Sequence, residues 1–249
     1  MTIKRIGLIE MGTGFSGKDI RGDVRSVLDA IKVGKKAKLD AIIGPEFSLV
    51  DKNRIVEKPA WRYYYTDEEH NRLISLLESQ SKDSKMLVIP GTMVYMDGDG
   101  NARNLLPVIS DGALLHSYHK RLNGGTTSFF YDSIVGRTNP PFAAGRESNV
   151  FEYRGERIGL EVCADTGRLS YNNVKDLDLQ ILSSCGIQFT NHVIKEGGIF
   201  VLTDGYSKRA SLSVLSAGKM DLKNPLYKNT LRYGLSVDPI YLSIYNIQP

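Results

Sequence analysis

Cysteine is scarce in this chain, with two residues among 249, Cys163 and Cys185. Small secreted domains that depend on disulfides carry more cysteines in much shorter chains. A chain of this length buries roughly three quarters of the surface that its unfolded form exposes, so it needs neither disulfides nor structural metals. We therefore expect a protein of a reducing compartment.

Long hydrophobic runs are also absent. A membrane-spanning helix needs a run of about 18 or more apolar residues, and none occurs here. The N-terminus carries no charged-then-apolar leader, and no repeat or Pro/Gly/Ser-rich linker divides the chain. The sequence therefore predicts one domain over residues 1–249, cytoplasmic and without a membrane partner.

A large excess of one charge is missing as well. The 32 Lys and Arg residues stand against 28 Asp and Glu residues, which leaves a net charge of +4. The densest basic stretch, residues 32–38, is typical of the solvated face and end of a helix. Nucleic-acid-binding proteins concentrate basic residues on one surface, so we expect no nucleic-acid partner.

The first third of the chain alternates between short apolar runs and helical patterns. The runs predict buried strands over residues 3–11, 39–43 and 86–89. Apolar residues at helical spacing predict a helix over roughly 19–36. A capping box at residues 66–69, followed by leucines and isoleucine on one face, predicts the start of a second helix.

Tight turns become frequent after residue 90. They separate predicted strands at 93–96 and 105–109, and a hairpin with its turn near Gly155 leads into a strand at 158–162. Further buried strands are predicted at 179–182 and 199–202, whereas 121–149 has the composition of a long loop. This order of elements predicts mixed sheets with helices outside, and two sheets between helix layers satisfy it.

Three reactive side chains directly follow apolar runs. Glu46 follows residues 39–45, Lys120 follows residues 114–119, and Cys163 follows residues 158–162. Active sites of α/β proteins are built at such strand ends. Each residue alone has a plainer interpretation: a solvated acid, a solvated lysine and a small hydrophobic core residue.

Together the three residues have the parts of a thiol-dependent acyl-transfer site. A carboxylate base and a nearby ammonium help to generate a thiolate near neutral pH. After attack on an amide or nitrile carbon, a fixed ammonium and a backbone N–H stabilise the developing negative charge. The carboxyl group then protonates the departing amine and activates the water that cleaves the thioester.

The segments around these residues resemble the motifs of the nitrilase superfamily, the carbon–nitrogen hydrolases. That family has a strand ending in Pro-Glu, a Tyr-x-Lys-x-x-Leu segment and a Gly-x-x-x-Cys-x-Asp segment. The matching segments here, in the family's order, are Ile43-Gly44-Pro45-Glu46-Phe47-Ser48, Tyr118-His119-Lys120-Arg121-Leu122 and Gly159-Leu160-Glu161-Val162-Cys163-Ala164-Asp165. Looser similarity extends the resemblance over residues 3 to about 205.

The resemblance implies an α-β-β-α sandwich that forms a wider stack on dimerisation. It implies hydrolysis of a small amide, carbamoyl or related C–N bond through a covalent thioester, with no metal and no organic cofactor. Glu46 would be the general base, Lys120 the oxyanion stabiliser and Cys163 the nucleophile, with the backbone N–H of Ala164 as a second oxyanion donor. The implied partners are a small-molecule substrate and further copies of the same chain.

One element of the family's pattern is missing. Many members have a second glutamate between the lysine and the cysteine, which orients the lysine. Here the first glutamate after Lys120 is Glu147, which comes after the Ala144-Gly145 element that should follow it. Asp132 is the carboxylate of the intervening loop and the candidate substitute; the other interpretation makes it a surface residue.

This departure keeps two other functions open. One is a nitrilase-fold protein with little or no hydrolase activity that acts in binding; the other is an acyltransferase that passes the same thioester to an amine. Among the remaining candidates, Gly12 to Lys18 departs from a phosphate loop because Asp19 follows the lysine. His116 and His119 lack a third nearby metal ligand, and Cys185 has the character of a core residue.

Overall fold

The computed structural model describes residues 2–11, 24–49, 64–122, 141–186, 191–205, 209–232 and 240–247, and these form two β-sheets packed face to face. The first sheet has the strand order β13-β14-β1-β2-β3-β5-β4, with β6 paired to β5. Its strands, in chain order, are β1 (Arg5–Glu10), β2 (Ala41–Ile43), β3 (Leu87–Ile89), β4 (Met93–Met96), β5 (Ala102–Ser110), β6 (Ala113–His119), β13 (Tyr227–Arg232) and β14 (Ile240–Asn246).

The second sheet has the order β12-β11-β10-β9-β8-β7. Its strands are β7 (Val150–Tyr153), β8 (Glu156–Val162), β9 (Leu177–Ser184), β10 (Ile194–Asp204), β11 (Arg209–Ser216) and β12 (Lys219–Lys223). The three central strands, β8, β9 and β10, are parallel, so their carboxyl ends meet at one edge of the sheet. β1, β2 and β3 are likewise parallel in the first sheet.

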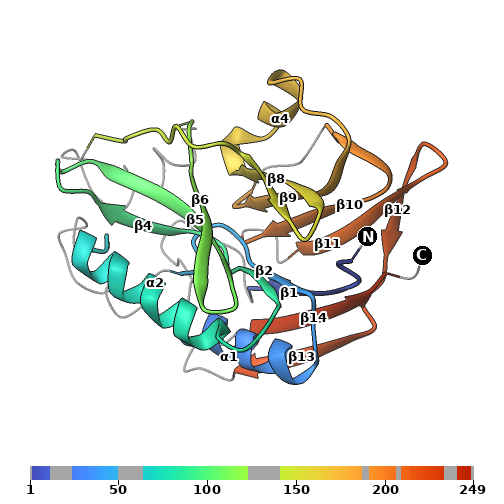
Figure 1. Cartoon of the computed structure of the whole chain (residues 1–249), viewed down its shortest axis with the longest axis horizontal. Coiled ribbons are helices and arrows are strands. Elements are labelled where there is room, and N and C mark those ends of the chain that lie inside the picture. The colour runs from blue at the N-terminus through green and yellow to red at the C-terminus, as the bar shows by residue number, and fades with distance from the viewer. Residues whose placement is uncertain are drawn as a thin grey trace.

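Helices cover the outer faces of both sheets, which gives four layers (Figure 1). α1 (Val24–Lys36) and α2 (Asp67–Ser81) lie on the first sheet, where Ile31 and Leu77 pack against outward-facing residues of its strands. The short helix α4 (Arg168–Tyr171) lies on the second sheet, and its Leu169 packs against Leu177 and Leu182. The expected α-β-β-α sandwich is therefore confirmed.

The space between the sheets is a continuous apolar core. Alternate residues of each strand point into it because successive side chains of a strand face opposite sides. The inward-facing residues include Leu8, Ile43, Ile89, Leu160, Ile181 and Val201, all fully buried. This core brings the end of β2 opposite the ends of β8, β9 and β10.

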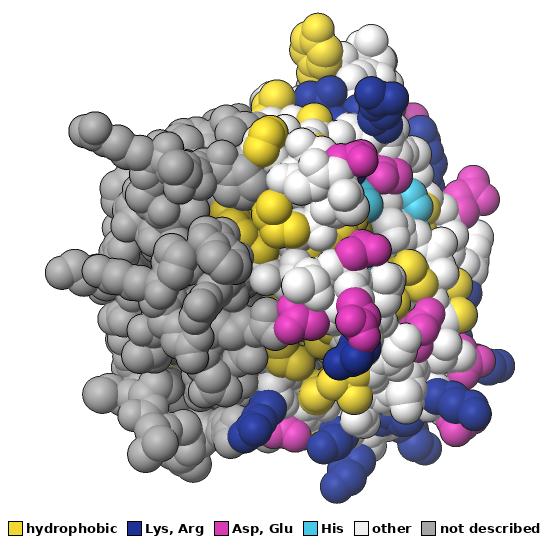
Figure 2. All heavy atoms as spheres, turned by 90° about the vertical axis from the view of Figure 1, so that its left-hand side faces the viewer, with side chains coloured by type: hydrophobic (Ala, Val, Ile, Leu, Met, Phe, Trp, Pro, Cys, Tyr) yellow, Lys and Arg dark blue, Asp and Glu magenta, His cyan; other side chains and the backbone are white. Residues whose placement is uncertain are grey.

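The predicted capping box of α2 is present. The Thr66 hydroxyl accepts a hydrogen bond from the Glu69 backbone N–H, and the Glu69 carboxylate accepts one from the Thr66 N–H. Asp67 and Glu68 add negative charge to the first turn, where the helix dipole favours it. Figure 2 shows the side of the molecule that carries this end of the helix, and acidic side chains gather on the part of that side that the structure describes.

The structure also extends the predicted pattern. The hairpin turn at Gly155 and the strand at 93–96 are confirmed. The predicted strand at 199–202 is longer in the structure, Ile194–Asp204, and its pairing with β9 is irregular between Ile194 and Ile199. Four strands, β11 to β14, lie beyond the last predicted one, and β14 fills the position between β13 and β1. No helix in the described ranges is long and apolar enough to cross a membrane.

Candidate active site

Glu46 lies where β2 leaves the first sheet. Gly44 allows this exit, because a Cβ at its position would lie 2.2 Å from the Pro90 carbonyl oxygen. Phe47, just after the glutamate, has a left-handed backbone (φ 62°), and its N–H donates to the Thr92 hydroxyl over 2.9 Å. Close packing against the end of β3 thus holds Glu46 in a fully buried position.

Lys120 reaches Glu46 from the end of β6. Its Nζ donates to Glu46 Oε1 over 2.7 Å, and both side chains are fully buried. Asn104, on the neighbouring strand β5, donates from Nδ2 to the same oxygen over 2.9 Å. The other carboxylate oxygen of Glu46, Oε2, is buried and has no hydrogen-bond partner among the described residues.

The charge state of Lys120 follows from these neighbours. Burial by itself lowers the pKa of a lysine, but the charge of Glu46, which also accepts a hydrogen bond from Lys120, outweighs it and the pKa is raised. The ammonium therefore keeps its proton although it is out of contact with water. A buried cation fixed in this way can stabilise a developing negative charge without reorganising.

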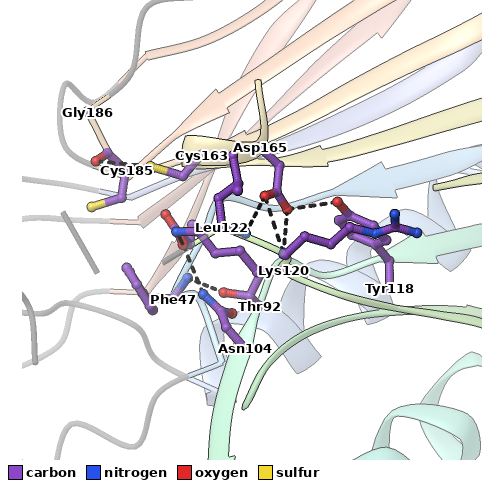
Figure 3. A network of polar contacts seen from close by, with 12 residues as sticks. Phe47, Thr92, Asn104, Tyr118, Lys120, Leu122, Cys163, Asp165, Cys185 and Gly186 are labelled. Atoms are coloured by element: carbon purple, nitrogen blue, oxygen red, sulfur yellow. Dashed lines mark hydrogen bonds and ion pairs between the residues drawn. The ribbon is translucent and has the colours of Figure 1, made fainter. Parts of the chain in front are cut away.

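Cys163 begins the turn that follows β8. It starts a 3₁₀ turn, Cys163–Asp165, and is fully buried with a left-handed backbone (φ 46°). Its Sγ lies 3.9 Å from the carbonyl oxygen of Cys185, the first residue after β9. Figure 3 shows the network with the sulfur atoms of both cysteines at its edge.

Asp165 ties the turn that carries Cys163 to the segment that carries Lys120. Its Oδ2 accepts from the Tyr118 hydroxyl over 2.7 Å, and its carboxylate also accepts from the backbone N–H groups of Arg121 and Leu122. Burial and the charge of Asp165 raise the pKa of Tyr118, so the phenol stays protonated and keeps donating. The two segments are therefore held together on both sides of Lys120.

The structure brings the three predicted residues into one buried cluster at the facing ends of the two sheets (Figure 3). Ala164 directly follows Cys163, and its role as an oxyanion donor stays a prediction. Asp132 lies outside the described residues, so its role stays a prediction too. Glu147 is engaged elsewhere: its Oε1 lies 2.8 Å from Nδ1 of His119.

Other polar residues of the cluster escaped the sequence analysis. Asn104 is a buried amide on β5, directly before the apolar run at 105–109, and no local pattern distinguishes it from an exposed polar residue at a strand end. Tyr118 and Asp165 stand inside the recognised motifs, but nothing local reveals that they bond to each other across 47 positions.

The remaining candidates have structural partners. His116 Nε2 lies 2.8 Å from the Ser148 carbonyl oxygen, and His119 Nε2 lies 3.0 Å from the Tyr95 hydroxyl. Cys185 is buried as expected, and burial, together with the charge of Glu46, raises the pKa of its thiol. The glycine-rich segment at 12–18 lies outside the described residues.

Known proteins share this fold. The structure superimposes on an amidase from Nesterenkonia sp. with a TM-score of 0.63 and 14% identity, covering 98% of this chain and 90% of the amidase. A carbon–nitrogen hydrolase from Helicobacter pylori G27 matches with a TM-score of 0.62 and 15% identity, covering 98% and 89%. The glutamine-dependent NAD+ synthetase of Acinetobacter baumannii gives 0.58 and 16%, covering 98% of this chain and 45% of the synthetase.

A sequence relationship accompanies the structural one. The glutamine-dependent NAD(+) synthetase of Acinetobacter baylyi is 27% identical over 159 residues, which is 64% of this chain and 26% of the synthetase. The chain thus spans about a quarter of that relative's length. No family model matches the sequence. By its architecture this is an α/β protein of two packed sheets, and its fold is that of the nitrilases and carbon–nitrogen hydrolases.

Proposed function

We propose that the chain is a nitrilase-superfamily hydrolase that cleaves a small amide, carbamoyl or related C–N bond through a thioester on Cys163. The observation that carries the proposal is the buried Lys120–Glu46 ion pair in the same site as Cys163 (Figure 3). A buried pair of this kind is costly to desolvate and does little for stability. A catalytic role accounts for it because both charges are used in the reaction.

The first half of the reaction forms the acyl-enzyme. Glu46 takes the thiol proton of Cys163 on Oε2, the oxygen that has no described partner, and the thiolate attacks the amide carbon. The electron pair of the C=O bond moves to the oxygen, where the Lys120 ammonium and the Ala164 N–H stabilise it. Loss of one such donor costs about 2.7–4 kcal/mol of transition-state stabilisation in enzymes.

The second half releases the acid. The tetrahedral adduct collapses, the C–N bond breaks, and Glu46 gives its proton to the departing amine. Glu46 then takes a proton from water as the water oxygen attacks the thioester carbon. This second adduct collapses, the C–S bond breaks to release the acid, and Glu46 returns the proton to the Cys163 sulfur. Glu46 carries every proton in this route, so the route calls for no metal or organic cofactor.

Proteins with the same fold indicate which substrates to try first. Mutants of the Nesterenkonia amidase are known in complex with butyramide and with acrylamide added at the active-site cysteine. The synthetases with this fold are described as glutamine-dependent. Small aliphatic amides and the side-chain amide of glutamine are therefore the first probes, followed by carbamoyl compounds and nitriles.

The test compares Cys163→Ala with Cys185→Ala, a matched loss of the neighbouring thiol. We expect ammonia release from at least one probe by wild type and by Cys185→Ala, and none above background by Cys163→Ala. Intact-protein mass spectrometry with fluoroacetamide should show one acetamide adduct, absent in Cys163→Ala. Adducts on Cys185 alone, or turnover that survives Cys163→Ala, would overturn the proposal.

Two further results separate the alternative functions. If added amines compete with water for the acyl group, the protein is an acyltransferase that uses the same thioester. If no probe gives ammonia or an adduct while the protein stays folded, a binding role replaces catalysis. Self-association of the chain is part of the proposal, and sedimentation velocity measures it directly.

A further inference from the structure

The apolar layer between the sheets ends in two hydroxyl groups. Inward-facing positions of β9 carry Leu179 and Ile181 and then Ser183, and those of β10 carry Ile199 and Val201 and then Thr203. Ser183 and Thr203 are register partners on adjacent strands, and both are fully buried. Aliphatic side chains would continue the layer, so the change to hydroxyls at this end calls for a reason.

Both hydroxyls bond to one atom of the opposite sheet. Ser183 Oγ donates to the Gly44 carbonyl oxygen over 2.9 Å, and Thr203 Oγ1 donates to the same oxygen over 3.0 Å. The Gly44 N–H donates in turn to the Ile89 carbonyl over 2.8 Å. The Gly44 peptide groups are thus held from both sheets, and the two buried hydroxyls are satisfied as burial demands.

This contact joins the segments that carry Glu46 and Cys163. Gly44 is two residues before Glu46, and Ser183 is the register partner of Val162, the residue before Cys163. The end of β10 also packs here, because a Cβ at Gly205 would lie 3.3 Å from the Glu46 carbonyl oxygen. The two hydroxyls therefore link the end of β2, which leads to Glu46, to the end of β10 and to the end of β9, which lies beside the strand that leads to Cys163.

We infer that Ser183 and Thr203 are positioning residues that fix Glu46 relative to Cys163 across the two sheets. The inference rests on the proposed function, because it gives a reason for holding these two residues at a set separation. In enzymes, a shift of about 1 Å in a reacting group lowers the rate about 100-fold. Two hydrogen bonds on the carbonyl preceding Pro45-Glu46 restrict such a shift.

The first test removes the hydroxyls with little change of shape. We expect the double variant Ser183→Ala/Thr203→Val to lower kcat about 10- to 100-fold, with KM within about twofold. Thr203→Ser, which keeps the hydroxyl, should keep near-wild-type kcat, unlike Thr203→Val. Ser110→Ala is the matched control, because it removes a buried hydroxyl that bonds to Tyr153 far from the site. Each single variant keeps one hydrogen bond to the Gly44 carbonyl oxygen. If the double variant does not fold, kcat and KM are measured on the single variants instead.

The second test asks whether the effect acts through Glu46. Peptide mapping measures the rate at which iodoacetamide alkylates Cys163. The rate is compared with and without the double substitution, once in the wild-type chain and once in a chain that carries Glu46→Gln. Positioning predicts a loss of about tenfold in wild type and less than about twofold in Glu46→Gln, since coupled residues give non-additive effects. Equal losses in both backgrounds would overturn the inference.

The two tests separate failure of the inference from failure of the proposed function. If wild type hydrolyses an amide and the double variant is equally active, the positioning role is wrong and the function stands. If no amide is hydrolysed but alkylation shows the Glu46-dependent loss, the function is wrong and the positioning role stands. If alkylation is the same in wild type and Glu46→Gln, Glu46 is not the base and both fall.

Discussion

At the scale of single residues, two chemically important positions have unfavourable backbone conformations. Cys163 and Phe47, the neighbour of Glu46, are non-glycine residues with positive φ. Such conformations cost about 1–3 kcal/mol each and persist only where the surroundings enforce them. Cys163 directly follows β8, and Phe47 directly follows the buried Glu46, so both lie in tightly packed surroundings that enforce these conformations. Nothing in the identity of a phenylalanine or a cysteine predicts this conformation.

A second buried carboxyl group gives a prediction at this scale. Glu161 is fully buried in β8 and accepts hydrogen bonds from the Leu169 N–H and from Gln180 Nε2, each over 3.1 Å. Burial outweighs these bonds and raises its pKa. The folded state therefore binds this proton more tightly than the unfolded chain, and stability falls as pH rises from the ordinary glutamate pKa through the raised one.

Replacing Glu161 by Gln removes this dependence. The free energy of unfolding of Glu161→Gln, minus that of wild type, should increase as pH rises above about 4.3, the ordinary glutamate pKa. Urea denaturation at a series of pH values measures the difference, and any constant offset from altered hydrogen bonds cancels in its slope. A difference that is flat with pH would show that the pKa of Glu161 is not raised.

At the scale of elements, local patterns and local structure agree best in α2. The sequence predicts its first residues from the capping box, and the structure has that box, followed by buried Leu73, Ile74 and Leu77. Capping is a contact between residues three positions apart, so it is determined by the sequence nearby. β2 and β3, by contrast, have three residues each: they end where the apolar runs predict but begin one or two residues later.

The cap leads to a prediction about stability. Thr66→Ala should lower the free energy of unfolding by about 1 kcal/mol, because the Glu69 backbone N–H loses the Thr66 hydroxyl as its acceptor. Urea denaturation measures this, with Ser75→Ala on the exposed face of the same helix as the control. That control should be neutral or slightly stabilising, since alanine favours the helix interior. An equal loss in both variants would contradict the role of the cap.

At the scale of the whole molecule, stability depends on the core between the sheets. Ile181 is fully buried at its centre, on the middle strand β9, whereas Leu222 on the edge strand β12 is 64% exposed. Ile181→Ala should lower the free energy of unfolding by about 2–5 kcal/mol, because it loses buried apolar area and leaves a cavity. Leu222→Ala should stay within about 0.5 kcal/mol of wild type.

Equilibrium unfolding in urea measures both variants. The midpoint should move for Ile181→Ala while the slope with urea stays that of wild type, because the surface exposed on unfolding is unchanged. A small effect of Ile181→Ala, comparable with that of Leu222→Ala, would mean that the two sheets do not share a single packed core.

The sequence alone determined the local features: apolar runs, the capping box of α2, the turn at Gly155, and reactive residues at the ends of runs. Tertiary structure decided which of these meet. Lys120 and Glu46 are 74 positions apart, and Asn104 and Glu46 are 58 apart. β14 pairs with β1 from the opposite end of the chain. Periodicity records which face of an element is buried, but the partner of that face is set by packing between distant segments.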